Sequence, residues 1–210
     1  HDVIFVKEAL DPATYKVSDE FACSNCKALL TKKRLEKSLV EHFDRALNAS
    51  VRTPRRVPVL VYYKSGGKVH VKTPTKEDRA LLDKIDAMPL PAEVPIDAMM
   101  HASDPLQRWG DKWRAGTASF SHVHHLFLPR AAQTLAALWR RAGEVPDRRI
   151  ANAIRFWIES HFANLSLQNR FRPEVSFPYN PLNGVYYVGS AIAEADPFTA
   201  YRNKMERIVE

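Results

Sequence analysis

The stretch "RRVPVLVYYKSGGKVHVKTP", residues 55–74, predicts a β-hairpin. Valines alternate with other residues on both sides of the Ser-Gly-Gly sequence at residues 65–67, and glycine readily adopts the positive φ that tight hairpin turns require. Pro58 cannot donate a ladder hydrogen bond, so the first strand is expected at an edge. Thr75, with Asp78 three residues later, is typical of a capping box and predicts a helix directly after the hairpin.

Upstream of the hairpin, the pattern predicts short β structure over residues 1–30 and then a helix over residues 31–48. In the second segment, apolar side chains recur every four residues, which is the spacing of one helix face. The residues of this stripe are Leu35, Leu39, Phe43 and Leu47.

Downstream, proline-rich residues 89–116 predict a connection, followed by helices over residues 129–143, 147–165 and 196–210. Two strands are expected within the last module, at residues 174–177 and 184–190. The predicted class is α+β, with a small zinc-ribbon-like β element and hairpin followed by a mainly helical module with a short β-hairpin. The expected domains are residues 1–88, the connection 89–116, and residues 117–210.

The composition is that of a globular protein with a basic surface. Among 210 residues, 31 basic and 24 acidic side chains give a net charge of +7, which favours polyanionic partners such as nucleic acid. The sequence contains no apolar run of the roughly 20 residues needed to cross a bilayer and no recognisable signal peptide. With two cysteines spaced as C-x-x-C, a cytoplasmic location is expected.

Cys23 and Cys26 are the only cysteines of the chain. Their spacing is typical of half a structural zinc site, which needs about four ligands. Two thiolates alone would hold zinc weakly, so the site is expected to be incomplete, with His42 or His1 as candidates for a further ligand.

A second group of metal-ligand residues is the histidine cluster His122, His124 and His125. Imidazoles two residues apart on a strand could share a metal ion. No carboxylate accompanies them in the sequence, and apolar residues surround them, so histidines packed at a strand-to-helix junction are the preferred interpretation. The same lack of an orienting carboxylate argues against a hydrolase built on these histidines.

Motifs that would indicate catalysis are missing from the sequence. There is no G-x-G-x-x-G, no P-loop and no G-x-S-x-G. "NPLN" at residues 180–183 lacks the second proline and the aromatic residue of an amino-methyltransferase D/N-P-P-[YFW] motif, and it is interpreted as a turn. Whether the chain has enzymatic activity of its own therefore stays open, with no catalytic residue assigned.

Basic residues gather at several places and suit contacts with phosphate. The residues predicted to contact DNA are Arg52, Arg55, Arg56, Lys68, Lys72, Arg170 and Arg172. Trp109 and Trp113, four residues apart beside basic side chains, either join two domains, which is preferred, or form an aromatic platform for nucleotides.

Three segments resemble bacterial and phage DNA methylases in the order expected for that family. They are "HVKTPTKEDRALLDKID" at residues 70–86, "FSHVHHLFLPRAAQTLAALW" at 120–139 and "NGVYYVGSAIAEADPFTAYRNKMERI" at 183–208. The resemblance extends over roughly residues 15–210. The chain departs from the family at Arg130-Ala131, where relatives often carry Arg-Gln or Arg-Asn.

The resemblance implies an inserted domain of an S-adenosylmethionine-dependent enzyme that methylates N6 of adenine or N4 of cytosine. In this family, the region lies between the cofactor motif and the D-P-P-Y motif, so S-adenosylmethionine would bind only to the parent enzyme. It also implies a zinc ribbon whose second cysteine pair is Cys23 and Cys26, with the first pair expected just before His1.

Together with the basic charge, this resemblance implies a non-catalytic DNA-binding, target-recognition domain of a bacterial restriction–modification methyltransferase. Its expected partners are double-stranded DNA and the catalytic domain of the parent chain, with no membrane. The alternative is a protein-interaction or scaffold domain that docks on the methyltransferase core without touching DNA. The target sequence, the methylated base and the oligomeric state do not follow from the sequence.

Overall fold

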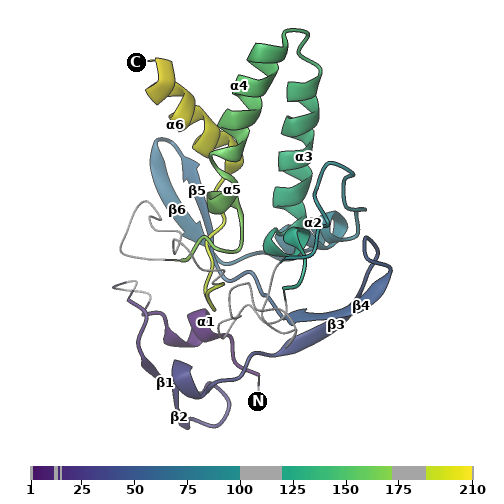
Figure 1. The fold of residues 1–210 in the computed structure, drawn as a ribbon. Helices are drawn as coiled ribbons and strands as arrows, with labels where there is room; N and C mark the ends of the chain where they lie inside the picture. The colour runs from purple at the N-terminus through teal and green to yellow at the C-terminus, as the bar shows by residue number, and fades with distance from the viewer. Residues whose placement is uncertain (1, 12–13, 15, 100–119, 172–187, 210) are drawn as a thin grey trace. The chain divides into compact units, whose positions relative to one another are not determined.

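The computed structural model describes residues 2–11, 14, 16–99, 120–171 and 188–209 (Figure 1). The chain divides into two compact units. The first unit comprises residues 1–42 and 52–88, and the second comprises residues 43–51 and 89–210. Helices and small antiparallel hairpins occur together, so the α+β class is confirmed. None of the described helices is long and apolar enough to span a membrane.

The first unit begins with a short helix and a small hairpin. Helix α1 (Phe5–Ala9) precedes strands β1 (Glu20–Ala22) and β2 (Leu29–Thr31), which pair antiparallel. Phe21 of β1 is buried, and its ring meets that of Phe5 edge to face at a centroid distance of 5.7 Å. This pair fastens α1 onto the hairpin, whose turn carries the two cysteines.

The prediction of a helix over residues 31–48 is wrong. The segment instead forms a 3-10 turn at Lys32–Arg34, strand β3 (Leu39–Asp44) and, after a turn, strand β4 (Ala49–Pro54), which pairs with β3. Leu39 and Phe43 of the expected helical stripe are exposed. In the turn between the two strands, Asn48 adopts a positive φ of 50°, which asparagine tolerates better than most residues.

The hairpin at residues 55–74 and the following helix are confirmed. Strand β5 (Val61–Ser65) pairs antiparallel with β6 (Lys68–Lys72), and Gly66 and Gly67 form the two-residue turn at φ values of 57° and 77°. Both positive φ values are those of a type I′ turn. Helix α2 (Lys76–Asp86) begins with the predicted capping box, in which Thr75 and Asp78 exchange side-chain to backbone hydrogen bonds.

The second unit is built on a helical hairpin. Helices α3 (Pro129–Gly143) and α4 (Arg148–Glu159) pack side by side, as Figure 1 shows. Pro129 stands in the first turn of α3, where its missing N–H costs nothing, and the Asp147 side chain accepts the first free N–H groups of α4. Both helix starts agree with the sequence analysis.

The expected helix over residues 147–165 is interrupted. Helix α4 ends at Glu159, and a short helix α5 (Phe162–Leu165) follows after Ser160 and His161. The Ser160 hydroxyl donates to the carbonyl of Trp157, which gives a local hydrogen bond at the break. Ile150, in the first turn of α4, is exposed.

The C-terminal helix α6 (Pro197–Val209) completes the core of the helical hairpin. Tyr201 is buried against Ile158 of α4 and donates its hydroxyl hydrogen to the Ile158 carbonyl at 2.8 Å. Leu135, Ala142 and Leu165 complete this buried cluster.

A second buried cluster lies around residues 120–128. It contains Phe120 and Leu126 together with Met99, Leu167 and Val188. The backbone N–H of Leu167 donates to the carbonyl of Leu126 at 2.7 Å, and that of Met99 donates to the carbonyl of Ser121 at 2.8 Å. The histidine segment is therefore a fixed part of this unit.

Several sequence predictions lie outside the described residues. These are the tryptophan pair Trp109 and Trp113, the strand at residues 174–177, the turn at residues 180–183, most of the strand at residues 184–190, and Arg172.

Candidate metal centre

Asp44 is the last residue of β3, and its carboxylate organises the turn that follows. The carboxylate oxygen Oδ1 accepts the backbone N–H of Ala46 at 2.9 Å and that of Leu47 at 3.3 Å. Aspartate accepts such bonds at turns and at helix N-caps, and in both cases the aspartate itself is not helical, so Asp44 cannot lie inside a helix. Residues 45–48 are thus held by one oxygen of Asp44, and the other oxygen, Oδ2, is left for partners elsewhere.

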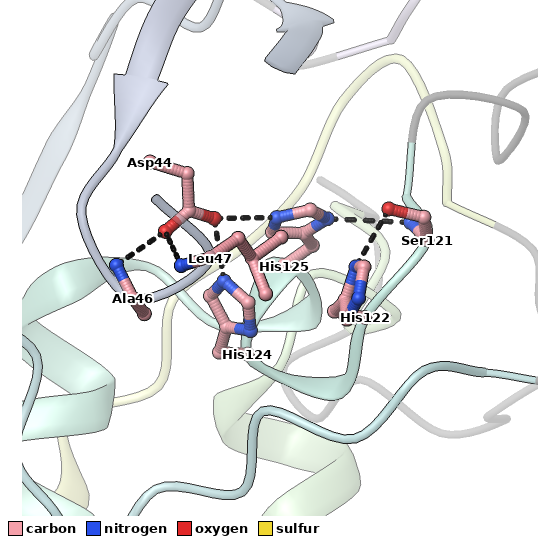
Figure 2. Close-up of polar contacts among 7 residues, drawn as sticks. All are labelled: Asp44, Ala46, Leu47, Ser121, His122, His124 and His125. Carbon is pink, nitrogen blue, oxygen red and sulfur yellow. Dashed lines mark hydrogen bonds and ion pairs between the residues drawn. The ribbon is translucent and has the colours of Figure 1, made fainter. Parts of the chain in front are cut away.

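Two consecutive histidines occupy that second oxygen. His124 and His125 lie in the 3-10 helix Val123–Leu126, and their Nε2 atoms lie 2.7 Å and 3.0 Å from Oδ2 of Asp44. Figure 2 shows both imidazoles turned toward the carboxylate, which comes from a chain segment far away in the sequence. The sequence analysis expected these residues on a strand, whereas they form a single helical turn.

The cluster is shielded from solvent, and its carboxylate is fully hydrogen-bonded. The side chains of Asp44, His124 and His125 are 9%, 8% and 5% exposed. Burial raises the pKa of Asp44, but the hydrogen bonds from His124 and His125 outweigh burial and hold that pKa well below its usual range. Asp44 is therefore an anion in the folded protein.

His125 has a hydrogen-bond partner on each ring nitrogen. Its Nδ1 accepts the backbone N–H of Ser121 at 3.2 Å, so in the neutral ring the proton resides on Nε2 and is donated to Asp44. Burial lowers the pKa of His125, and the hydrogen bond to Asp44 offsets this only in part. His122 stands apart from the carboxylate, and its Nδ1 lies 2.8 Å from the Ser121 hydroxyl.

His124 differs from His125 in that one of its nitrogens has no partner. Its Nδ1 is buried and meets no hydrogen-bonding atom among the described residues. A buried nitrogen without a partner is costly, and such atoms are often associated with function.

The three side chains together could hold a metal ion. Their ligand atoms, one from each side chain, all lie within 4.8 Å of one another. Two imidazole nitrogens and a carboxylate oxygen are a donor set common to transition-metal sites. The sequence analysis found the histidines but not Asp44, because it placed Asp44 inside a helix. Asp44 and Asn48 could have indicated a turn, but no signal in the sequence pairs Asp44 with the histidines.

The two cysteines of the predicted half zinc site lie in a turn. Cys23 and Cys26 lie in the β1–β2 turn, where the N–H of Lys27 donates to the Cys23 carbonyl and Lys27 has a φ of 60°. Hydrogen bonds from the backbone N–H groups of Cys26 and Asn25 lower the pKa of the Cys23 thiol, against the opposing effect of burial. This favours the thiolate, the form that binds metal. In the described part of the chain, no third ligand side chain joins the pair.

The predicted DNA-contacting residues are distributed over both units. Arg52 lies on β4 and Lys68 on β6, and both are exposed. Arg170 belongs to the second unit, is half-buried and forms an isolated backbone bridge with Ile192.

The other predicted contacts are already engaged within the first unit. Arg55 forms an ion pair with Asp2 at 3.6 Å, and Lys72 forms one with Asp78 at 2.7 Å. Arg56 is half-buried, and this burial lowers the pKa of its guanidinium to about 10. The side chain is therefore less accessible to a phosphate group than the sequence indicated.

Comparisons of the chain with protein-family models, curated proteins and solved structures found no match.

Proposed function

We propose that this chain is a duplex-DNA-binding module, the target-recognition part of a bacterial S-adenosylmethionine-dependent DNA amino-methyltransferase. In this proposal, the chain positions DNA, while the cofactor and the methyl-transfer chemistry belong to the catalytic domain of the parent enzyme. The single observation that carries the DNA-binding part is the concentration of positive charge on one hairpin-bearing segment of the first unit. The link to methyltransferases rests on the sequence resemblance.

The net charge is unevenly distributed along the chain. Residues 52–88 contain nine lysines and arginines against four aspartates and glutamates, so this segment carries +5 of the total +7. Residues 1–42 are balanced, with seven of each sign. A local surplus of this kind attracts phosphate groups and steers association with nucleic acid.

The β5–β6 hairpin presents part of this charge to solvent. Lys64 and Lys68 flank its turn, both are exposed, and neither has an acidic partner among the described residues. Arg52 on β4 is likewise exposed and has no acidic partner among the described residues. A two-stranded β-ribbon is narrow enough to enter the major groove of B-form DNA. The hairpin is therefore the proposed groove-facing element.

Aromatic side chains on the same hairpin support this assignment. Tyr62 and Tyr63 are exposed, and the Tyr63 ring stacks on that of His70 at a centroid distance of 5.3 Å. Exposed aromatic rings beside cationic side chains suit contacts with sugars and bases. Because Arg55 and Lys72 are ion-paired and Arg56 is partly buried, their expected contribution to phosphate binding is smaller than the sequence indicated.

Zinc belongs to this proposal as a structural ion at the cysteine turn. The thiolates of Cys23 and Cys26 would supply two ligands, and two more would have to come from outside the described residues. Its role would be to stabilise the β1–β2 hairpin, since structural zinc contributes directly to folding.

The test is a fluorescence-anisotropy titration of the chain with a random-sequence duplex at several salt concentrations. If Arg52, Lys64 and Lys68 each contact a phosphate, the logarithm of the binding constant should fall with the logarithm of salt with a slope of about −2.7 or steeper. The scaffold alternative would be favoured if the chain did not bind the duplex at low salt but was retained on an immobilised methyltransferase catalytic domain.

A further inference from the structure

We propose that Asp44, His124 and His125 bind one divalent transition-metal ion of the zinc type. This site is distinct from the cysteine turn and does not depend on DNA binding. It is inferred from the convergence of three buried ligand side chains from two distant segments of the second unit.

The distances are close to those that a bound ion would impose. Zinc lies about 2.0–2.2 Å from imidazole nitrogen and carboxylate oxygen, so ligand atoms around one tetrahedral ion are about 3.3–3.6 Å apart. The Nε2 atoms of His124 and His125 are 2.7 Å and 3.0 Å from Oδ2 of Asp44. To accommodate the ion, each Nε2 atom would have to move about 0.3–0.9 Å away from Oδ2.

The ligand chemistry selects the class of metal. Calcium takes six to eight oxygen ligands, and magnesium prefers octahedral oxygen, so a site with two imidazoles favours zinc or a neighbouring transition metal. The Asp44 anion would balance one of the two positive charges of the ion. Three protein ligands leave a fourth position for water or an added ligand.

Metal binding would exchange the present hydrogen bonds for coordination. Each histidine that binds through Nε2 must carry its proton on Nδ1. At His124, the partnerless Nδ1 can take this proton without breaking a contact. At His125, Nδ1 now accepts the N–H of Ser121, so the Ser121 amide would have to turn away.

This rearrangement sets the expected affinity. Metal-binding histidines usually donate their other ring N–H to an acceptor, and loss of such partners weakens binding by about 10–100-fold. Among the described residues, neither histidine has that acceptor. We therefore expect binding that is specific for transition metals but weaker than that of a site with both acceptors in place.

The experiment uses the full 210-residue chain carrying Cys23→Ser and Cys26→Ser, so that thiolates cannot contribute. After chelator treatment, the protein is titrated with Co²⁺ and separately with Zn²⁺, and bound metal is measured by elemental analysis after dialysis. The expected result is one ion per chain, with visible cobalt bands and no thiolate charge-transfer absorption. Absence of bound metal in the folded protein would overturn the proposal.

Matched variants assign the ion to the three residues. His124→Gln and Asp44→Asn should each lower the association constant at least tenfold, whereas His122→Gln should bind like the parent because His122 lies on the same segment but does not contact Asp44. Circular dichroism verifies that each variant is folded. If Asp44→Asn does not fold, the metal affinity of His124→Gln alone tests the ligand set. Equal losses in His122→Gln and His124→Gln would contradict this ligand set. DNA binding is scored separately in the presence of chelator, so the two proposals can fail independently.

Discussion

Asp44 and His124 lie 80 positions apart in the sequence, yet Oδ2 of one and Nε2 of the other are 2.7 Å apart in a buried environment. Within the second unit, this contact fastens the turn at residues 45–48 to the histidine helix. The same carboxylate organises the turn and receives both histidines, so its removal affects two kinds of hydrogen bond at once.

Replacing Asp44 by asparagine should destabilise the protein. The four groups around the carboxylate include two backbone N–H donors on Oδ1 and two imidazoles on Oδ2. An amide has only one oxygen, so its NH₂ faces either the two backbone donors or the two imidazoles, and in the second case His125 would have to give up the hydrogen bond from Ser121. We expect the free energy of unfolding, measured by urea denaturation with chelator present, to fall by about 1–3 kcal/mol.

Asp83→Asn is the matched control, because Asp83 is exposed on α2 in the first unit. It should change the free energy of unfolding by no more than about 0.5 kcal/mol. Equal stability of Asp44→Asn and the parent would show that the carboxylate contributes nothing to folding.

Stability should depend on pH through His125, one of the two histidines that face Asp44. The folded-state pKa of His125 is lowered, so its contribution is complete above the unfolded pKa of about 6.5 and is lost as pH falls. The pKa of Asp44 is also lowered, and its contribution is lost only below about pH 4. The free energy of unfolding should therefore decrease between about pH 7 and pH 5.

The readout is a series of urea denaturations across this pH range with chelator present. His125→Gln should reduce the slope, while His42→Gln, at an exposed position of β3, should leave it unchanged. Some slope should survive in His125→Gln because burial also lowers the pKa of His161. If the free energy of unfolding of His125→Gln varied with pH as steeply as that of the parent, the pH dependence could not be assigned to His125.

The hairpin lysines should account for part of the salt dependence of DNA binding. Lys64→Ala combined with Lys68→Ala removes two proposed phosphate contacts, so the salt slope should become shallower by about 1.8. Arg141→Ala is the control, because Arg141 is exposed but paired with Glu144 at 2.8 Å. If both proteins show the same slope in anisotropy titrations, the β5–β6 hairpin does not contact phosphate.

Tyr201→Phe tests how α6 is held against α4. The Tyr201 hydroxyl donates to the Ile158 carbonyl in a buried position, and burial raises the pKa of the phenol above its usual range. Loss of this hydrogen bond with the ring retained should reduce the free energy of unfolding by about 0.5–1.5 kcal/mol. Phe198→Leu, at an exposed position of α6, should have little effect in the same thermal or urea melts.

Local signals predicted the elements that depend on local chemistry. The glycine turn at residues 66–67, the capping box of Thr75 and Asp78, and Pro129 at the start of α3 each restrict the backbone within a few residues. These predictions are confirmed. The DNA-contacting role of the basic residues stays a prediction, because charge in the sequence does not indicate which side chains are paired.

The helix predicted over residues 31–48 shows where local reasoning failed. Apolar residues recur there with helical spacing. However, the Asp44 carboxylate accepts the backbone N–H groups of Ala46 and Leu47, so Asp44 itself is not helical, and Asn48 adopts a left-handed conformation in the following turn. Periodicity describes which faces could be buried, whereas turn geometry decides the path of the chain. In this segment, the turn joins two strands, and no helix forms over residues 39–54.

The sequence by itself determined the α+β class, the central hairpin and the main helices, since these follow from backbone preferences over short stretches. Only the tertiary structure decided that Asp44 meets His124 and His125. That encounter joins residues about 80 positions apart, and no pattern within either segment specifies its partner. Burial makes this contact important for the stability of the fold, because a carboxylate removed from water must form its hydrogen bonds within the protein.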